Sequence, residues 1–117
     1  MIDPTPPGAV IEKALADVNG DGKLDAIIGT EAKKGASNGG GIYWYEYPSS
    51  GNPADAWARH TIIGSGHDYE DMIPYDVNHD GHMDIIASID KDQIAWFRNP
   101  GTTDGTWTKT SGEPLTY

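Results

Sequence analysis

The sequence predicts an all-β protein that consists of two four-stranded antiparallel sheets, and three observations support this. The chain has 15 Gly and 8 Pro among 117 residues, which disfavours long helices because both residue types interrupt them. Its apolar residues occur in short runs, either alternating with polar residues or uninterrupted, with turn residues at both ends, as is typical of strands. The chain also repeats itself, so that each strand-like run has a counterpart.

The repeat is defined by three landmarks that recur in the same order. Residues 15–28 (LADVNGDGKLDAII) recur as 74–87 (PYDVNHDGHMDIIA), 42–48 (IYWYEYP) as 94–100 (IAWFRNP), and 56–59 (AWAR) as 106–109 (TWTK). The offset falls from 59 to 52 and then to 50, so the first copy has about seven extra residues, which we place in a Gly-rich loop at 31–40. We expect the two units at 8–66 and 67–117, after a Pro-rich leader at 1–7.

The first two strands of each unit flank an acidic loop. Residues 10–16 are compatible with a helix when taken alone, but their counterpart at 69–75 contains Tyr69, Ile73 and Pro74, which favour a strand. The second strands, at 25–30 and 84–89, are apolar runs that start where the acidic loop ends. Each acidic loop is therefore expected to join two neighbouring strands.

The last two strands of each unit come from the aromatic landmarks. The third strands are expected at 41–47 and 93–98, ahead of Pro48 and Pro100, because proline fixes φ and has no N–H for the ladder. The fourth strands, at 57–63 and 106–110, follow clusters of turn residues. A repeated four-stranded unit of this length predicts a blade of a β-propeller.

Two blades are too few to close a propeller, which contains roughly 4–8. A free pair would leave a sheet face uncovered at each end, with residues such as Ile27, Trp44, Ile85 or Trp96. We therefore expect a homo-oligomer, as a trimer, a tetramer or a filament formed by head-to-tail contacts. The other arrangement that fits is a pair of blades within a longer chain.

Charge and composition limit the partners. The chain has 18 acidic and 8 basic residues, which gives a formal net charge of −10. This charge opposes nucleic acids and anionic membrane surfaces, and the apolar runs are too short to cross a bilayer, so we expect neither partner. The sequence has no cysteine, which excludes disulfides, thiolate nucleophiles and thiolate metal sites.

The two acidic loops, 17–25 and 76–84, indicate metal binding. Side-chain oxygens fall at loop positions 1, 3, 5 and 9, with glycine at position 6 for the tight turn. The carboxylates repel one another unless a cation neutralises them, and hard oxygen donors suit Ca²⁺, so we expect two Ca²⁺ ions, one in each loop. The expected ligands are Asp17, Asn19, Asp21, Lys23 and Asp25, and Asp76, Asn78, Asp80, His82 and Asp84, with Lys23 and His82 acting through main-chain carbonyls.

Two alternatives to this calcium site fit the loops less well. An EF-hand or dockerin-type loop shares the Asp-x-Asn-x-Asp-Gly core but needs a carboxylate at position 12 and flanking helices. Position 12 is Ile28 in the first loop and Ala87 in the second, and the surrounding residues favour strands. An acidic turn without an ion is disfavoured because both copies keep all four oxygen positions.

These residues resemble the FG-GAP/VCBS-type repeat of calcium-binding β-propellers, which occurs in integrin α-chain heads, certain fungal lectins and many secreted bacterial proteins. The resemblance covers nearly the whole chain after Gly8. It implies that the metal lies in the loop between the first and second strands of a blade. The Ile-x-Trp-[Tyr/Phe]-x-x-Pro motif, with the tryptophan that follows it, is similar to a subgroup found beside carbohydrate-active domains.

Ligand contacts outside the loops are expected from two sets of residues. The four tryptophans recur at matched positions of the two units, so most of them are expected to pack inside the blades. Trp57 and Trp107 follow turn residues and are the pair expected to be more exposed, where an indole face can stack on a sugar ring. His67 and Asp68 open the second unit, where innermost strands line a propeller channel. The alternative for this pair is a solvated acidic rim. No catalytic triad, phosphate-binding loop or zinc motif is present in the sequence.

These features together predict a non-enzymatic, extracellular, calcium-stabilised β-propeller module. It would bind a carbohydrate or a protein, or assemble with its own copies. Two alternatives remain open: a blade pair of a larger carbohydrate-active enzyme of the lyase or dehydratase type, and a structural subunit of an extracellular fibre.

Overall fold

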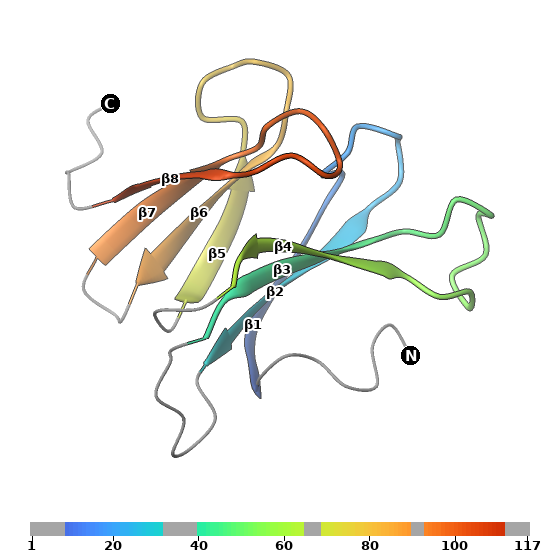
Figure 1. The fold of residues 1–117 in the computed structure, drawn as a ribbon, viewed down its shortest axis with the longest axis horizontal. Coiled ribbons are helices and arrows are strands. Elements are labelled where there is room, and N and C mark those ends of the chain that lie inside the picture. The colour runs from blue at the N-terminus through green and yellow to red at the C-terminus, as the bar shows by residue number, and fades with distance from the viewer. Residues whose placement is uncertain (1–8, 32–39, 65–68, 90–92, 112–117) are drawn as a thin grey trace.

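The computed structural model describes residues 9–31, 40–64, 69–89 and 93–111. These residues form two four-stranded antiparallel sheets in which each strand pairs with its neighbours in sequence (Figure 1). Sheet 1 contains β1 (Ala9–Ala16), β2 (Asp25–Glu31), β3 (Ile42–Glu46) and β4 (Ala58–Ile63). Sheet 2 contains β5 (Tyr69–Tyr75), β6 (Asp84–Ile89), β7 (Gln93–Arg98) and β8 (Thr108–Ser111). The predicted all-β class with two four-stranded sheets is confirmed.

The strand boundaries follow the predicted ranges to within two residues. The leader at 1–7, residues 32–39 of the inserted loop and the expected boundary between the units at 66/67 lie outside the described residues. Among the described residues, no helix has the length and apolar character needed to cross a membrane.

The two sheets lie side by side, with β1 and β5, the first strand of each sheet, next to each other (Figure 1). One hydrophobic core fills the space between the sheets and draws residues from both. Its largest fully buried aromatic side chains are Trp44 of sheet 1 and Tyr69 and Phe97 of sheet 2. Burial of these rings stabilises the fold, because large aromatic side chains remove much apolar surface from water.

The sheets use opposite faces for this contact. Ile27 of β2 belongs to the core, and Gly29, on the same side of β2, lies against the main chain of Tyr69. The repeat aligns Ile27 with Ile86, yet the β6 residues in the core are Ile85, Ala87 and Ile89. Successive side chains of a strand point to opposite faces. The face of sheet 2 that contacts sheet 1 is therefore equivalent, in the repeat, to the face of sheet 1 that does not contact sheet 2. The contact is therefore head-to-tail, as between neighbouring propeller blades.

This arrangement corrects the expected uncovered faces. Ile27, Trp44 and Ile85 are buried between the sheets, so the expectation that they lie on a free face is wrong. The opposite face of sheet 2 is more open to solvent, since Ile73, Tyr75 and Ile94 on it are 58%, 53% and 54% exposed. The outer face thus carries Ile73, Tyr75, Ile94 and Trp96.

Candidate metal centre

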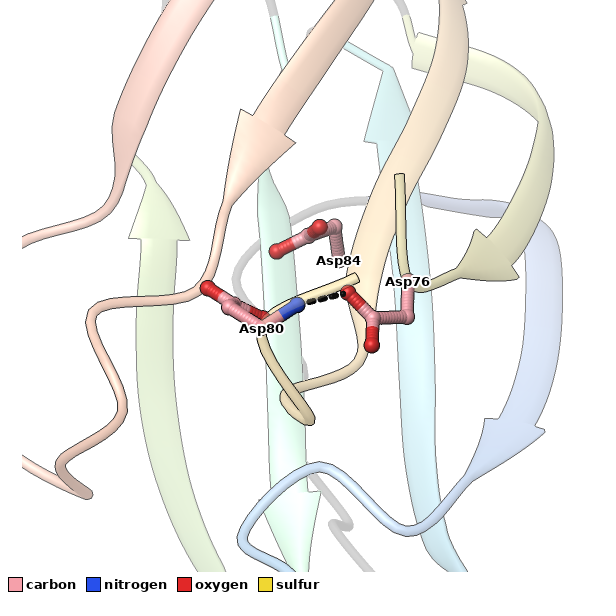
Figure 2. A group of neighbouring side chains, drawn as sticks. All are labelled: Asp76, Asp80 and Asp84. Atoms are coloured by element: carbon pink, nitrogen blue, oxygen red, sulfur yellow. Dashed lines mark hydrogen bonds between the residues drawn. The ribbon is translucent and has the colours of Figure 1, made fainter. Parts of the chain in front are cut away.

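The second acidic loop, between β5 and β6, brings three carboxylates together. Asp76 directly follows β5, Asp80 lies at the tip of the loop, and Asp84 is the first residue of β6. Carboxylate oxygens from all three residues lie within 4.8 Å of one another, and Figure 2 shows the side chains gathered around the loop. Three carboxylates at this spacing could together hold a metal ion through their oxygens.

Main-chain N–H groups hold the first two carboxylates in place. Asp76 accepts hydrogen bonds from the N–H groups of Asp80 (3.1 Å; Figure 2) and Gly81 (2.9 Å). Asp80 accepts one from the N–H of His82 at 2.9 Å, and this bond is the main reason that the pKa of Asp80 lies below its ordinary value. Gly81 has a φ of 88°, which favours glycine, in agreement with its predicted role in the turn.

The third carboxylate, Asp84, is fully buried. Its two oxygens accept hydrogen bonds from the N–H groups of Val77 (3.0 Å) and Asn99 (2.8 Å). Val77 belongs to the loop, and Asn99 follows β7. Asp84 therefore fastens the loop to the end of the third strand of its sheet, in addition to any role toward a metal.

The first loop, between β1 and β2, has the same hydrogen bonds. Asp17 accepts from the N–H groups of Asp21 (3.1 Å) and Gly22 (2.8 Å), and Asp21 accepts from the N–H of Lys23 (2.9 Å). Gly22 has a φ of 86°. Within the described ranges, three carboxylates come within 4.8 Å of one another only in the second loop, so the oxygens of the first loop are set wider.

Burial of the last aspartate of the first loop affects its charge. Asp25 is fully buried and accepts hydrogen bonds from the N–H groups of Val18 (2.9 Å) and Tyr47 (2.8 Å). Burial raises the pKa of Asp25, the two N–H groups oppose the shift, and the charges of Asp21 and Asp17 add to it. The folded chain thus lacks full compensation for this carboxylate, and a bound cation would supply it.

Among the remaining expected ligands, hydrogen bonds define the position of Asn19. The side-chain oxygen of Asn19 accepts from the N–H of Asp21 (3.3 Å), while its amide nitrogen donates to Glu46 (3.2 Å). Asn78 and the carbonyls of Lys23 and His82 stay predictions as ligands. The carboxylate and amide oxygens that each loop gathers suit a hard cation.

The expected aromatic contacts are only partly placed as predicted. Trp107 is 7% exposed and belongs to the core between the sheets, so the expectation that it is exposed is wrong, because the turn before β8 folds it inward. Trp57 is partly buried, and its indole N–H donates to the carbonyl of Pro53 at 3.0 Å. His67 and Asp68 lie outside the described residues.

A cavity of about 130 Å³ lies between the sheets beside both acidic loops. The first loop contributes Asn19, the second contributes His82, and Trp107 lines it as well. Trp44 also lines the cavity, and its ring stacks on that of His60 with the centroids 4.4 Å apart. The described part of the chain thus has a hollow with aromatic and uncharged polar walls at the end where the loops meet.

Asn99 belongs to this site although no sequence motif indicated it. Its side-chain amide donates to the carbonyls of Val18 (2.9 Å) and Met83 (3.0 Å), and its side-chain oxygen accepts from the N–H of Gly101 (2.9 Å). In the repeat, Asn99 aligns with Tyr47. The signal available in the sequence was this difference between the copies: the second has an amide side chain where the first has an aromatic one.

Comparison with known proteins places the chain in a family. Residues 17–87, more than half of the chain, match a family model described as an FG-GAP-like repeat. No curated protein and no solved structure matches the sequence. The matched range covers both acidic loops, the whole of sheet 1 after β1 and the first half of sheet 2. The chain therefore belongs to the FG-GAP-like repeat family.

Proposed function

We propose that the chain is a calcium-stabilised, non-enzymatic, extracellular β-propeller module that binds a carbohydrate or protein ligand and assembles through an open sheet face. The observation that carries the proposal is the pair of acidic loops with matching hydrogen bonds, one of which gathers three carboxylates within 4.8 Å. In such a module the loops and sheet faces bind the ligand and the partners, so the proposed function requires no catalytic group.

Calcium fits these loops better than magnesium does. Ca²⁺ accepts six to eight oxygen ligands in flexible geometry, whereas Mg²⁺ requires a nearly ideal octahedron and shorter bonds. Each loop presents carboxylates, an amide and main-chain carbonyls from a nine-residue segment, which suits flexible coordination. Extracellular calcium modules bind at about 10⁻⁴–10⁻³ M, and sites this weak fill only where calcium is plentiful. The proposed extracellular location is supported by the occurrence of FG-GAP-like repeats in extracellular proteins, and the weak affinity expected there is consistent with it.

Calcium is expected to raise the melting temperature of the chain after EDTA treatment. At about 10 mM Ca²⁺, a site with a Kd of 10⁻⁴–10⁻³ M stabilises the folded state by about 1.4–2.7 kcal/mol through mass action. Asp80→Ala and Asp21→Ala should each remove one such contribution in differential scanning calorimetry. Asp104→Ala is the matched control, because that side chain is 96% exposed and lies outside both loops. Equal melting temperatures with calcium and with EDTA would refute the proposal.

The ligand surface is supported by the cavity beside the loops. Its walls combine the indoles of Trp44 and Trp107 with the hydroxyl-bearing residues Thr102 and Thr103. Uncharged polar groups next to aromatic carbon suit a neutral, hydroxyl-rich ligand such as a sugar. A glycan array probed with the calcium-loaded chain would identify it.

The proposed assembly surface is the outer face of sheet 2. Ile73, Tyr75 and Ile94 are each more than half exposed there. The repeat aligns Ile73 with Ala14, and Ala14 packs against the core between the sheets. The head-to-tail contact of sheet 1 with sheet 2 would therefore be repeated if another blade covered this face, from a second copy or from a longer chain.

Assembly is expected in light scattering and native mass spectrometry of the calcium-loaded chain. A trimer or tetramer would indicate a closed ring, and a broad distribution of larger species would indicate a filament. Ile94→Asp should shift the population to the 12.6 kDa monomer, because it places a charge on the contact face. Ala56→Asp is the control, since Ala56 is exposed in the turn before β4 and lies outside both acidic loops and the outer face of sheet 2. A wild-type monomer would contradict self-assembly.

A further inference from the structure

A chain of hydrogen bonds joins the two acidic loops through Asn99. In the first loop, Asp25 accepts the N–H of Val18 at 2.9 Å. The carbonyl of the same Val18 accepts the side-chain amide of Asn99 at 2.9 Å. The N–H of Asn99 then donates to Asp84 of the second loop at 2.8 Å. Two residues therefore connect a carboxylate of one loop with a carboxylate of the other.

Every link in this chain is shielded from water. The bonds from Val18 to Asp25, from Asn99 to Val18 and from Asn99 to Asp84 are all buried. The second proton of the Asn99 amide goes to the carbonyl of Met83, so both donors of the side chain are used, one on each loop. A hydrogen bond in a low-dielectric interior is strong and costly to leave unmade, which means that the two loops cannot move independently at low cost.

We propose that Asn99 couples the two loops, so that an ion bound in one loop raises the affinity of the other. The inference rests on the proposed calcium binding and goes beyond it, because two separate sites would also stabilise the chain. Asn99 acts as a positioning residue: its described polar contacts are to the protein, and it touches each loop through a carbonyl or a carboxylate.

The coupling follows from shared ordering. An ion in the second loop fixes Asp84, and Asp84 fixes the N–H of Asn99. The amide of Asn99 is then held against Val18, whose N–H orients Asp25 in the first loop. The second ion therefore binds a loop that is already ordered, so less conformational entropy is lost on its binding. This gives positive cooperativity. Linkage requires the effect to be equal in both directions.

Calcium titrations of single-loop variants test the coupling. Asp80→Ala leaves only the first loop able to bind, and we expect its affinity to fall about fivefold or more below that of the same loop in the wild-type chain. Asn99→Ser should abolish this dependence, so that the first loop binds equally with and without Asp80. Asn52→Ser is the matched control, because Asn52 is exposed in the turn before β4, and it should keep the fivefold effect.

Hydrogen exchange gives a second readout that does not require the Asn99 variant to fold. In Asp21→Ala, calcium can occupy only the second loop, yet the exchange of the Val18 N–H in the first loop should slow about fivefold or more. The N–H of Ala54, bonded to Asn52 in a distant turn, should not change. Two ions that bind with unlinked affinities, or an unchanged Val18 N–H, would overturn the coupling and leave the proposed function intact. Absence of calcium binding in either loop would overturn both.

Discussion

Asp84→Ala is expected to lower the free energy of unfolding by about 2–6 kcal/mol even without calcium. The substitution leaves the N–H groups of Val77 and Asn99 without the acceptor that they share, and a buried donor that loses its partner costs about 1–3 kcal/mol. Asp84 and its hydrogen bond from Asn99 are buried, which limits replacement of the lost acceptor by water. Urea denaturation of the metal-free chain measures the loss.

Two further variants separate this role from metal binding. Asp84→Asn keeps one acceptor oxygen and should lose about half as much stability as Asp84→Ala. Asp104→Ala removes a carboxylate that is 96% exposed and should change stability by no more than about 0.5 kcal/mol. If Asp84→Ala matched Asp104→Ala in metal-free buffer, Asp84 would lack the structural role described.

Gly29→Ala is expected to destabilise the chain by about 1–3 kcal/mol or more, because it forces the two sheets apart. A Cβ atom on Gly29 would lie 2.6 Å from the main-chain oxygen of Tyr69. That oxygen belongs to β5 and cannot turn aside as a flexible side chain would. Urea denaturation gives the loss of stability, and near-ultraviolet circular dichroism reports the looser packing of Trp44.

Gly64→Ala is the matched control for this substitution. Its Cβ would lie 3.7 Å from the nearest atom, a methyl group of Thr61, which is an ordinary contact. A tolerated Gly→Ala change is neutral or stabilises by about 0.4–1 kcal/mol, because it reduces the entropy of the unfolded chain. Equal stability of the two variants would mean that the sheets do not pack through β2 and β5.

The strands were predictable because sequence period and repeat gave the same answer. Residues 10–16 were ambiguous alone, and the counterpart with Pro74 resolved them in favour of β1. The start of the last strand was predicted two residues too early, since β8 begins at Thr108 rather than at residue 106. Trp107 packs into the core there, and local pattern does not distinguish such a residue from the first residue of a strand.

The pairing of the sheets could not be predicted, because it depends on which face of each strand meets the other sheet. The repeat aligns Ile27 with Ile86, but the core contains Ile27 and Ile85. Equivalent positions thus face different surroundings, one covered and one open. A repeat reveals the local structure that its two copies share. In head-to-tail packing, however, residues at equivalent positions of the repeat have different neighbours.

The ligand oxygens and turn glycines of the acidic loops could be predicted from the sequence, whereas the hydrogen bonds that hold the loops in place could not. The spacing of oxygens and the positive φ of Gly22 and Gly81 follow from the motif. The burial of Asp84 and the bridge formed by Asn99 depend on residues far away in sequence. Such contacts arise from tertiary packing and leave no local period in the sequence.

The most direct test of the calcium proposal is the stoichiometry of calcium binding to the EDTA-treated chain. Equilibrium dialysis or isothermal titration calorimetry should give two Ca²⁺ ions per chain, one for each acidic loop, with dissociation constants of about 10⁻⁴–10⁻³ M. Asp80→Ala should reduce the stoichiometry to one. A wild-type stoichiometry near zero would contradict the account, because the two loops would then be acidic turns that their own N–H groups suffice to hold.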